Sequence, residues 1–271
     1  MPLVSTDPTL DDRLLPTRRP AGRPVMRQRW EHLLFLHWEV AAEAVARLLP
    51  PGLEVDLFEG RAYVGLVPFS MKGVRPSGLP SVRGLSDFHE TNVRTYVKTP
   101  DGMPGVWFFS LDAANLVAVS IARTWFRLPY YYARMSVSAR EGPDESWSLS
   151  YKSKRIYPSK PAASTRIEAE VDGPTAPAVP GSPEFFLAER YLLYTTGGGP
   201  RRDGPGGSNL LKGRVHHTPY PLRSARVLDL EESAVAAAGI IRPEVPPIAH
   251  YARRVVVEVF GLEPVRDENP R

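Results

Sequence analysis

Short hydrophobic runs, several of which alternate with polar residues, recur along most of the chain. Alternation with a period of two is typical of strands, and branched and aromatic residues favour them. We predict strands over residues 32–40, 53–58, 61–71, 89–99, 106–111, 115–119, 135–139, 146–156, 163–171, 191–195, 210–218, 223–230 and 252–261. So many short strands predict a mainly β (β-rich α+β) chain, folded as an antiparallel barrel or as two sheets.

Helical spacing is confined to a few short segments. Residues 41–49 place apolar side chains on one side and end at Pro50-Pro51-Gly52. Ser182-Pro183 predicts the start of a second helix, because serine caps a first turn and proline fits into it. Residues 231–238 and 123–127 are two further short candidates.

Turns and loops separate these elements. Glu59-Gly60 predicts a hairpin of the strands that flank it, and the turn at residues 141–144 predicts another. Residues 72–88 are expected to form a long loop. Residues 197–208 hold six glycines but lack the Gly-Lys-Ser/Thr ending of a phosphate-binding loop, so a mobile hairpin loop is favoured there.

Composition indicates a folded chain. Of the 271 residues, 42% are hydrophobic and 10% aromatic, which is enough for a sizeable core. We expect a single domain over residues 26–262, between a flexible basic leader (residues 1–25) and a C-terminal tail (residues 263–271). The sequence contains no apolar run of membrane-spanning length, no signal sequence and no cysteine. A soluble, cytoplasmic protein is therefore expected.

The net charge of +4 is concentrated near the N-terminus. Residues 1–29 contain six arginines against three aspartates, which leaves the rest of the chain near neutral. A nucleic-acid-binding face should extend over the folded body. We therefore expect neither a nucleic acid nor a membrane as partner, and a homo-oligomer stays open.

The sequence offers little for metal or cofactor chemistry. His216 and His217 are adjacent, so on a strand they point to opposite faces. Neither a His-Glu-x-x-His motif nor a Gly-x-Ser-x-Gly elbow is present. We expect no metal and no cofactor.

A polar row lies on one side of the strand at residues 89–97. Glu90, Asn92, Arg94 and Tyr96 share one face, whereas threonines and valines suited to a core occupy the other. On an outer face, the polar row would simply be solvated. Inside a barrel mouth, it would form a site in which Arg94 binds a carboxylate.

Three tyrosines follow Pro129. If a strand begins at Tyr130, then Tyr130 and Tyr132 share one face and Tyr131 lies on the other. The phenols either line a cavity or pack with their hydroxyls at a rim.

Several motifs occur together and in order: Leu48-Leu49-Pro50-Pro51-Gly52-Leu53-Glu54, residues 92–97, residues 105–113, Leu128-Pro129-Tyr130-Tyr131 and His216-His217. They closely resemble the YqjF-like family of uncharacterised bacterial proteins, also called the domain of unknown function 2071. The match extends from residue 26 to residue 260. Tyr132 stands where this family usually has a histidine, and the resemblance implies no activity because the family has none assigned.

More distantly, the chain is similar to the acetoacetate decarboxylase superfamily, which implies a barrel-like β fold around a small central cavity. Glu90 takes the place of an active-site glutamate of those enzymes, and Arg123 precedes Pro129 at their spacing. Tyr130 and Tyr131 then occupy the positions of the Schiff-base lysine pair. A phenol forms no imine, so the resemblance supports the fold and the cavity but contradicts decarboxylation.

These features predict a cavity protein for a small carboxylate or carbonyl compound. The leading interpretation is a non-decarboxylating lyase, isomerase or hydratase. Arg94 would anchor charge, Glu90 would act as acid or base, and Tyr130 or Tyr132 would donate to an oxyanion. The other expected ligand contacts are Asn92, Tyr96, Arg123, Tyr131 and His216. The alternatives are a non-catalytic ligand-binding or sensor protein, and a structural or interaction protein.

Overall fold

The computed structural model describes residues 6–197 and 209–265. Those residues form twelve strands: β1 (Met26–Val40), β2 (Glu54–Val55), β3 (Ala62–Pro76), β4 (Phe88–Lys98), β5 (Pro104–Ala113), β6 (Tyr130–Glu141), β7 (Trp147–Tyr157), β8 (Ser164–Val171), β9 (Leu192–Thr196), β10 (Leu210–His217), β11 (Leu222–Glu232) and β12 (Ile248–Pro264). The helices are short: α1 (Leu10–Leu14), η1 (Leu15–Thr17), α2 (Ala42–Ala46), α3 (Leu116–Ile121), η2 (Ala122–Phe126), η3 (Pro143–Glu145), α4 (Pro183–Ala188) and α5 (Ala234–Ala237).

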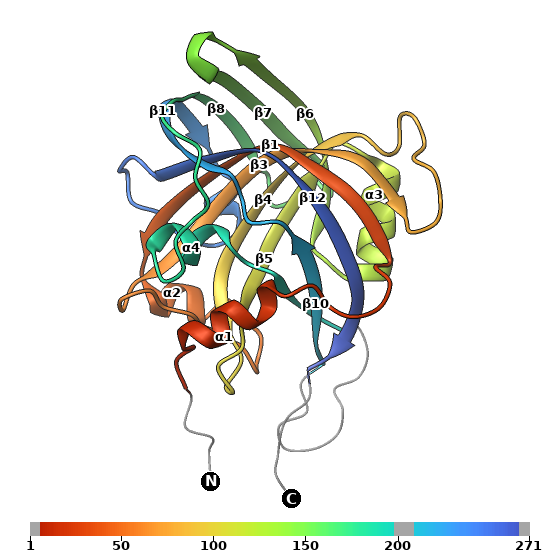
Figure 1. The fold of residues 1–271 in the computed structure, drawn as a ribbon, viewed down its shortest axis with the longest axis vertical. Coiled ribbons are helices and arrows are strands. Elements are labelled where there is room, and N and C mark those ends of the chain that lie inside the picture. Colours follow the sequence, from red (N-terminus) through yellow and green to blue (C-terminus); the bar gives the residue numbers. More distant parts are fainter. Residues whose placement is uncertain (1–5, 198–208, 266–271) are drawn as a thin grey trace, which may run out of the picture.

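The strands close on themselves twice (Figure 1). A small ring runs through β12, β1, β3, β4, β5, β9 and β10, and the β10–β12 pairing closes it. A large ring runs from β5 through β6, β7, β8 and β11 to β12, and returns through β1, β3 and β4. Most neighbours are antiparallel, but β5 pairs in parallel with both β6 and β9. The expected barrel is therefore a pair of barrels with a common wall.

The wall shared by the two rings, formed by β12, β1, β3 and β4, is buried on both faces. The apolar run of β1 fits this position. In β1, Leu34 and Leu36 pack with Trp147 and Ile167 of the large ring, whereas Phe35 packs into the small ring. Two hydrophobic interiors therefore lie on either side of one layer of strands. Strands of this kind read as continuous apolar runs rather than as strict alternation.

A bulge at His32 changes which residues of β1 face the small ring. His32 has a φ of 52°, and the pairing of β1 with β3 shifts register between Glu31 and Leu36. Trp30, before the bulge, and Leu33, after it, both pack into the small-ring core. A bulge adds one residue, so even positions before it and odd positions after it share a face.

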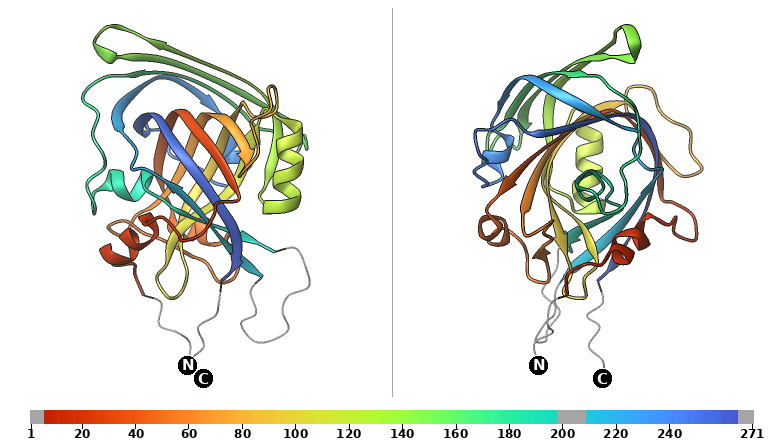
Figure 2. Two further views of the ribbon diagram at one scale, coloured as in Figure 1. Left: turned by 45° about the vertical axis from the view of Figure 1, so that its right-hand side comes forward. Right: turned by 60° about the vertical axis from the view of Figure 1, so that its left-hand side comes forward.

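The segment around α4 lies within the outline of the small ring when the molecule is viewed along it (Figure 2, right). Its Phe186 and Leu187 pack against Tyr63, Tyr96 and Val106 from three strands of that ring. The predicted helix start is confirmed, because the Ser182 side chain accepts a hydrogen bond from Phe185 N at 3.2 Å. The segment therefore closes one end of the ring.

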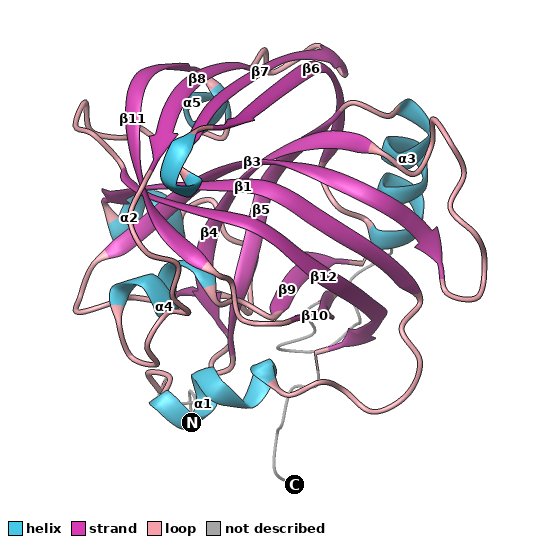
Figure 3. Ribbon diagram, turned by 45° about the horizontal axis from the view of Figure 1, so that its top comes forward, coloured by secondary structure: helices cyan, strands magenta, loops and turns pink. Residues whose placement is uncertain are grey.

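The expectation of a flexible N-terminal leader is wrong for the part that the structure describes. Residues from Thr6 onward form α1 and η1 and lie against the body (Figure 3). Arg13 donates two hydrogen bonds to Asp56, at 2.7 and 2.8 Å, and Lys98 contacts Asp7 at 2.6 Å. Arg13, one of the basic residues counted as a tail, therefore has a buried partner in the body of the chain. Residues 1–5 lie outside the described residues.

Several element predictions are corrected by long-range pairing. Residues 115–119 form a helix instead of a strand, because the Asn115 side chain caps α3. The predicted two-residue turn at Glu59-Gly60 is present, because Phe58 and Arg61 form an antiparallel bridge across it. However, β2 pairs with β4 rather than with β3, so the turn does not join a hairpin of those two strands. β3 extends through Gly73 into the expected loop, and β12 extends to Pro264, beside β10, into the expected C-terminal tail. The glycine-rich loop lies outside the described residues except at Gly197.

Within the described ranges, no helix is both long and apolar enough to cross a membrane. The same residues contain no cluster of histidine and carboxylate side chains arranged to hold a metal ion.

Candidate functional site

The polar row of β4 faces the interior of the small ring. Glu90, Asn92 and Arg94 pair with Phe69, Val67 and Gly65 of β3, and both of those apolar side chains belong to the small-ring core. All four polar residues of the row are buried, with exposed fractions of at most 7%. The solvated alternative for this row therefore does not apply.

Arg94 and Tyr96 lie beside His37 from β1. The Tyr96 hydroxyl is 2.6 Å from His37 Nε2 and 2.6 Å from the Leu187 carbonyl oxygen. Arg94 Nη2 donates to the same carbonyl at 2.9 Å. Gly65 makes this packing possible, because a Cβ there would lie 3.1 Å from the His37 ring and 3.4 Å from Arg94 Cγ.

These contacts assign the tautomer of His37. The Tyr96 hydroxyl has one proton, and the Leu187 carbonyl can only accept it, so His37 Nε2–H donates to Tyr96. A neutral imidazole with its proton on Nε2 keeps a lone pair on Nδ1. Burial, with Arg94 and His250 nearby, holds the pKa of His37 well below its usual range. His37 is therefore a neutral base with a buried Nδ1, for which the described residues supply no hydrogen-bond partner.

Arg94 is a buried cation among neutral groups. None of the described carboxylates forms an ion pair with it, and its Nε has no partner among the described residues. Burial lowers the pKa of His217 to about 4 and raises the pKa of Tyr96, so both neighbours are uncharged near neutral pH. An unpaired charge in an apolar interior is costly, and an anion placed against it relieves that cost.

Glu90 forms a second cluster in the same interior. The Tyr130 hydroxyl donates to Glu90 Oε2 at 2.8 Å, so these two predicted residues do meet. Burial raises the pKa of Glu90 to about 8, although hydrogen bonds from Tyr130 and Asn92 act in the opposite direction. Glu90 is therefore mostly protonated at neutral pH and titrates near it.

The two clusters are separated along the strand. Residues four apart on a strand are about 13 Å apart. The Arg94 guanidinium reaches toward Tyr96 and Leu187, away from Glu90. A small molecule bound to Arg94 would therefore lie closer to His37 than to Glu90.

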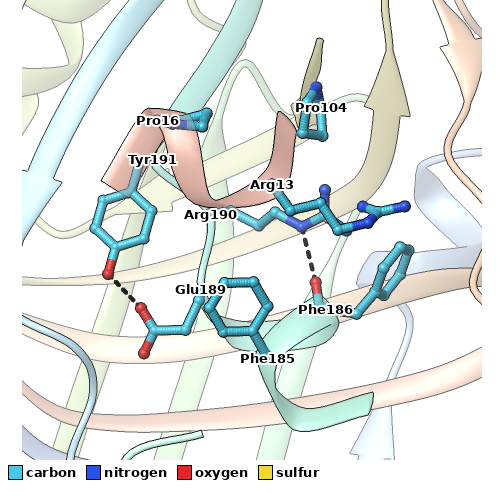
Figure 4. A pocket seen from close by; sticks show the side chains of 8 residues that line it. All are labelled: Arg13, Pro16, Pro104, Phe185, Phe186, Glu189, Arg190 and Tyr191. Carbon is cyan, nitrogen blue, oxygen red and sulfur yellow. Dashed lines mark hydrogen bonds between the residues drawn. The ribbon is translucent and has the colours of Figure 1, made fainter. Parts of the chain in front are cut away.

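A further buried carboxylate, Glu189, lies near the closed end of the small ring (Figure 4). It accepts hydrogen bonds from the Tyr191 hydroxyl and from Tyr220 N, and burial raises its pKa. In the same view, Arg13 and Arg190 lie over Phe186. Both arginines also contact Asp56, so the N-terminal segment and the end of α4 are held by one carboxylate.

The remaining predicted site residues lie outside these clusters. Tyr132 packs at the edge of the small-ring core, and Arg123 Nη1 donates to the Tyr130 carbonyl at 2.6 Å. Tyr131 lies 3.6 Å from the Arg155 guanidinium, beside Asp112. His216 pairs with Glu258 in the β10–β12 ladder and is half-buried.

Sequence reasoning missed His37 and His217. His217 is buried, stacks on Tyr191 and packs against the tilted ring of Tyr220, with ring centroids 4.3 Å apart in both cases. The adjacency of His216 and His217 did predict opposite faces, but not which of them faces inward. His37 lies next to an apolar run and its partner Tyr96 is far away in sequence, so only the neighbouring strands could reveal it.

Three known proteins resemble this chain in sequence or in architecture. The chain is 37% identical over 243 residues to the uncharacterized protein YqjF of Bacillus subtilis, covering 90% of this chain and 93% of that protein. The enduracididine biosynthesis enzyme MppR, in complex with pyruvate, superposes with a TM-score of 0.57 at 14% identity, over 91% of this chain and 92% of its own. Acetoacetate decarboxylase from Legionella pneumophila superposes with a TM-score of 0.57 at 15% identity, over 97% and 98% of the two chains.

The structural matches establish an acetoacetate-decarboxylase-like fold and, at these identities, the fold alone. The family model of DUF2071, described as an uncharacterized conserved protein, matches residues 27–256. Together with the identity to YqjF, this match shows that the chain belongs to the DUF2071 family.

Proposed function

We propose that the protein binds a small carboxylate in the small ring, with Arg94 as the anchor, and acts on it as a non-decarboxylating enzyme. The observation that carries this proposal is the buried guanidinium of Arg94, which has no carboxylate partner among the described residues. A guanidinium presents a planar fork of donors that fits a carboxylate. MppR, which has a similar fold, was crystallised with pyruvate, and this makes a small keto acid a reasonable first ligand.

Proton transfer is the chemistry that the surrounding groups support. His37 is neutral and has a free lone pair on Nδ1, as a general base requires. The positive charge of Arg94 is one cause of its lowered pKa. A bound carboxylate would offset that charge, raise the pKa of His37 and make it a better base once the ligand is in place. Removal of a proton next to a carbonyl is the first step of many lyase and isomerase reactions.

The anchor role is tested by replacing Arg94 with methionine. Arg94→Met leaves the Leu187 carbonyl satisfied by Tyr96, so we expect the variant to be at least as stable as the parent protein. Pyruvate binding, measured by calorimetry, should weaken by about tenfold or more, because a charged hydrogen bond contributes about 1.5–3 kcal/mol. Arg94→Lys should bind with intermediate affinity, and Arg226→Met on the surface should not differ from the parent. Unchanged pyruvate binding by Arg94→Met would contradict the proposal.

A measurement of turnover distinguishes the proposed enzyme from the alternative, a ligand sensor without catalysis. Incubation with pyruvate in heavy water, followed by NMR of the methyl group, detects reversible proton removal. An enzyme should exchange the methyl protons, and His37→Gln should bind pyruvate without exchanging them. Binding without exchange by the parent protein would favour the sensor, whereas loss of exchange only in Glu90→Gln would make Glu90 the base.

A further inference from the structure

β5 changes its parallel partner partway along its length. Val106 and Trp107 pair with Leu193 and Tyr194 of β9, and from Leu111 onward β5 pairs with β6. Residues 108–110 lie between these two pairings, where β9 and β6 diverge. We call this place the fork.

A bulge at the fork directs neighbouring aromatic side chains to different sides. The register of β4 and β5 shifts between Val93 and Arg94, so that Arg94 pairs with Phe108 and Val93 with Ser110. Phe109 is the additional residue. Phe108 packs against the small-ring clusters, whereas Phe109 packs against the large-ring cluster.

An open pocket of about 650 Å³ occupies the fork. This volume lies within the range of about 300–1,000 Å³ that is typical of small-molecule sites. Trp107, Phe108 and Phe109 of β5 are among the residues that line it, and Arg123 and Arg127 supply two positive charges. None of the described residues that line it is acidic. The pocket is therefore aromatic and cationic.

The segment that carries the two arginines is held in place. Arg123 Nη1 donates to the Tyr130 carbonyl at 2.6 Å, which ties η2 to the start of β6. Arg127 has a φ of 52°, a left-handed conformation that is uncommon outside glycine. The Thr195 hydroxyl donates to the Arg127 carbonyl at 2.8 Å and stabilises this turn against β9. A backbone in this conformation needs a compensating contact. The hydrogen bond from Thr195 supplies it from β9, on the opposite side of the fork.

We propose that the fork pocket is a second ligand site, which binds an organic anion with a flat aromatic body, specifically an aromatic carboxylate. The ring lies against Trp107 and Phe109, which are alternate residues of β5, and the carboxylate meets Arg127 and Arg123. The site does not depend on the proposed function of the small ring. Phe108 lies between the Arg94 cluster and the fork pocket, because it pairs with Arg94 and also lines the pocket.

The probe for this site is 1-naphthoate, with 1-naphthalenemethanol as its uncharged analogue. Naphthoate should bind to the parent protein and change the fluorescence of Trp107. Arg127→Gln should weaken naphthoate binding by tenfold or more but alter naphthalenemethanol binding by less than threefold. Arg226→Gln, on the surface, is the matched control and should bind naphthoate like the parent protein. Urea unfolding of each variant establishes that it is folded before binding is measured.

Two further variants locate the probe and separate this proposal from the first. Trp107→Phe should bind naphthoate in calorimetry but lose the fluorescence change. Arg94→Met should bind naphthoate within twofold of the parent protein, even if it has lost pyruvate. Equal binding of naphthoate and its uncharged analogue, or a fluorescence change that persists in Trp107→Phe, would overturn the fork site. Loss of naphthoate binding in Arg94→Met would place the probe in the small ring and would also overturn it.

Discussion

Two buried carboxylates, Asp56 and Glu90, differ in charge because their partners differ. Asp56 contacts Arg13 and Arg190, which hold its pKa below the usual value despite burial. Glu90 has only the neutral partners Tyr130 and Asn92, so burial dominates and its pKa rises to about 8. The neighbours of a buried carboxylate, and not its residue type, therefore decide whether it is a charged ion-pair partner or a group that exchanges protons near neutral pH.

The raised pKa of Glu90 predicts a pH-dependent effect of Glu90→Gln on stability. Between pH 4.5 and 8, the unfolded chain releases the Glu90 proton while the folded protein retains it, so this group destabilises the fold increasingly as pH rises. Glutamine cannot ionise and can still accept from Tyr130. We therefore expect Glu90→Gln to gain stability relative to the parent protein as pH rises, by a few kcal/mol at pH 8.

Urea unfolding at pH 5 and pH 8 measures this difference. Glu244→Gln, at an exposed position, serves as the control and should show no such trend. An equal effect of Glu90→Gln at both pH values would show that Glu90 ionises normally in the folded protein.

At the scale of elements, the N-terminal segment belongs to the fold. Arg13 makes a bidentate contact with Asp56, and Pro16 is buried, although the surrounding sequence has no apolar periodicity. Asp56 itself lies between β2 and β3 and has an exposed fraction of only 1%. The charge pair of Arg13 and Asp56 therefore holds this segment on the body of the protein, a role that a hydrophobic face has in most helices.

Arg13→Met should accordingly destabilise the protein. The substitution leaves buried Asp56 with Arg190 as its charged partner, and losing one partner of a buried pair costs about 3–5 kcal/mol at most. We expect the melting temperature at pH 7 to fall by several degrees, since about 1 kcal/mol corresponds to 2–4 °C at this chain length. The difference should shrink as the pH falls through the pKa of Asp56, because protonated Asp56 no longer needs a cation.

Arg18→Met is the matched control, because Arg18 lies in the same segment and is exposed. Calorimetric melting curves of both variants, at pH 7 and at pH 3, supply the comparison. A melting temperature of Arg13→Met equal to that of the parent protein at pH 7 would restore the interpretation of this segment as a dispensable leader.

For the whole molecule, two barrels with a common wall bring together side chains from many strands. The interior of the small ring combines His37 of β1 and Arg94 of β4 with the backbone of α4, and Tyr130 reaches it from β6 of the large ring. The described lysines lie in β3, β4, β7, β10 and the turn after β7. Lys98 is the buried one, and its amine contacts Asp7 and Glu54.

The protein should therefore form no Schiff base with acetoacetate. An imine needs a primary amine that reaches the bound carbonyl, and Tyr130 and Tyr131 occupy the positions expected for the lysine pair. Incubation with acetoacetate and borohydride, followed by intact-mass and peptide analysis, should detect no stoichiometric adduct. The Legionella pneumophila decarboxylase, treated in the same way, is the positive control. A single modified lysine in this chain would move the assignment toward imine chemistry.

The sequence by itself determined the strand-rich fold, the α4 cap at Ser182 and the polar row of Glu90, Asn92, Arg94 and Tyr96, because these depend on local periodicity and on side-chain contacts within a few residues. The contact of Glu90 with Tyr130 followed the resemblance to enzymes of known fold. Only the tertiary structure decided that the row faces the small ring, since that depends on strand pairing between distant segments.

The tertiary structure also decided how the interior is divided. The bulge at His32 sets which side chains of β1 face inward, and this places His37 beside Arg94. The contact between Arg13 and Asp56 forms only in the folded chain, because the two residues are 43 positions apart in sequence. Register, bulges and long-range ion pairs arise from the whole set of strand pairings, and local sequence does not encode them. For that reason the polar row of β4 could be read from the sequence, whereas its contact with His37 and its separation into an Arg94 cluster and a Glu90 cluster could not.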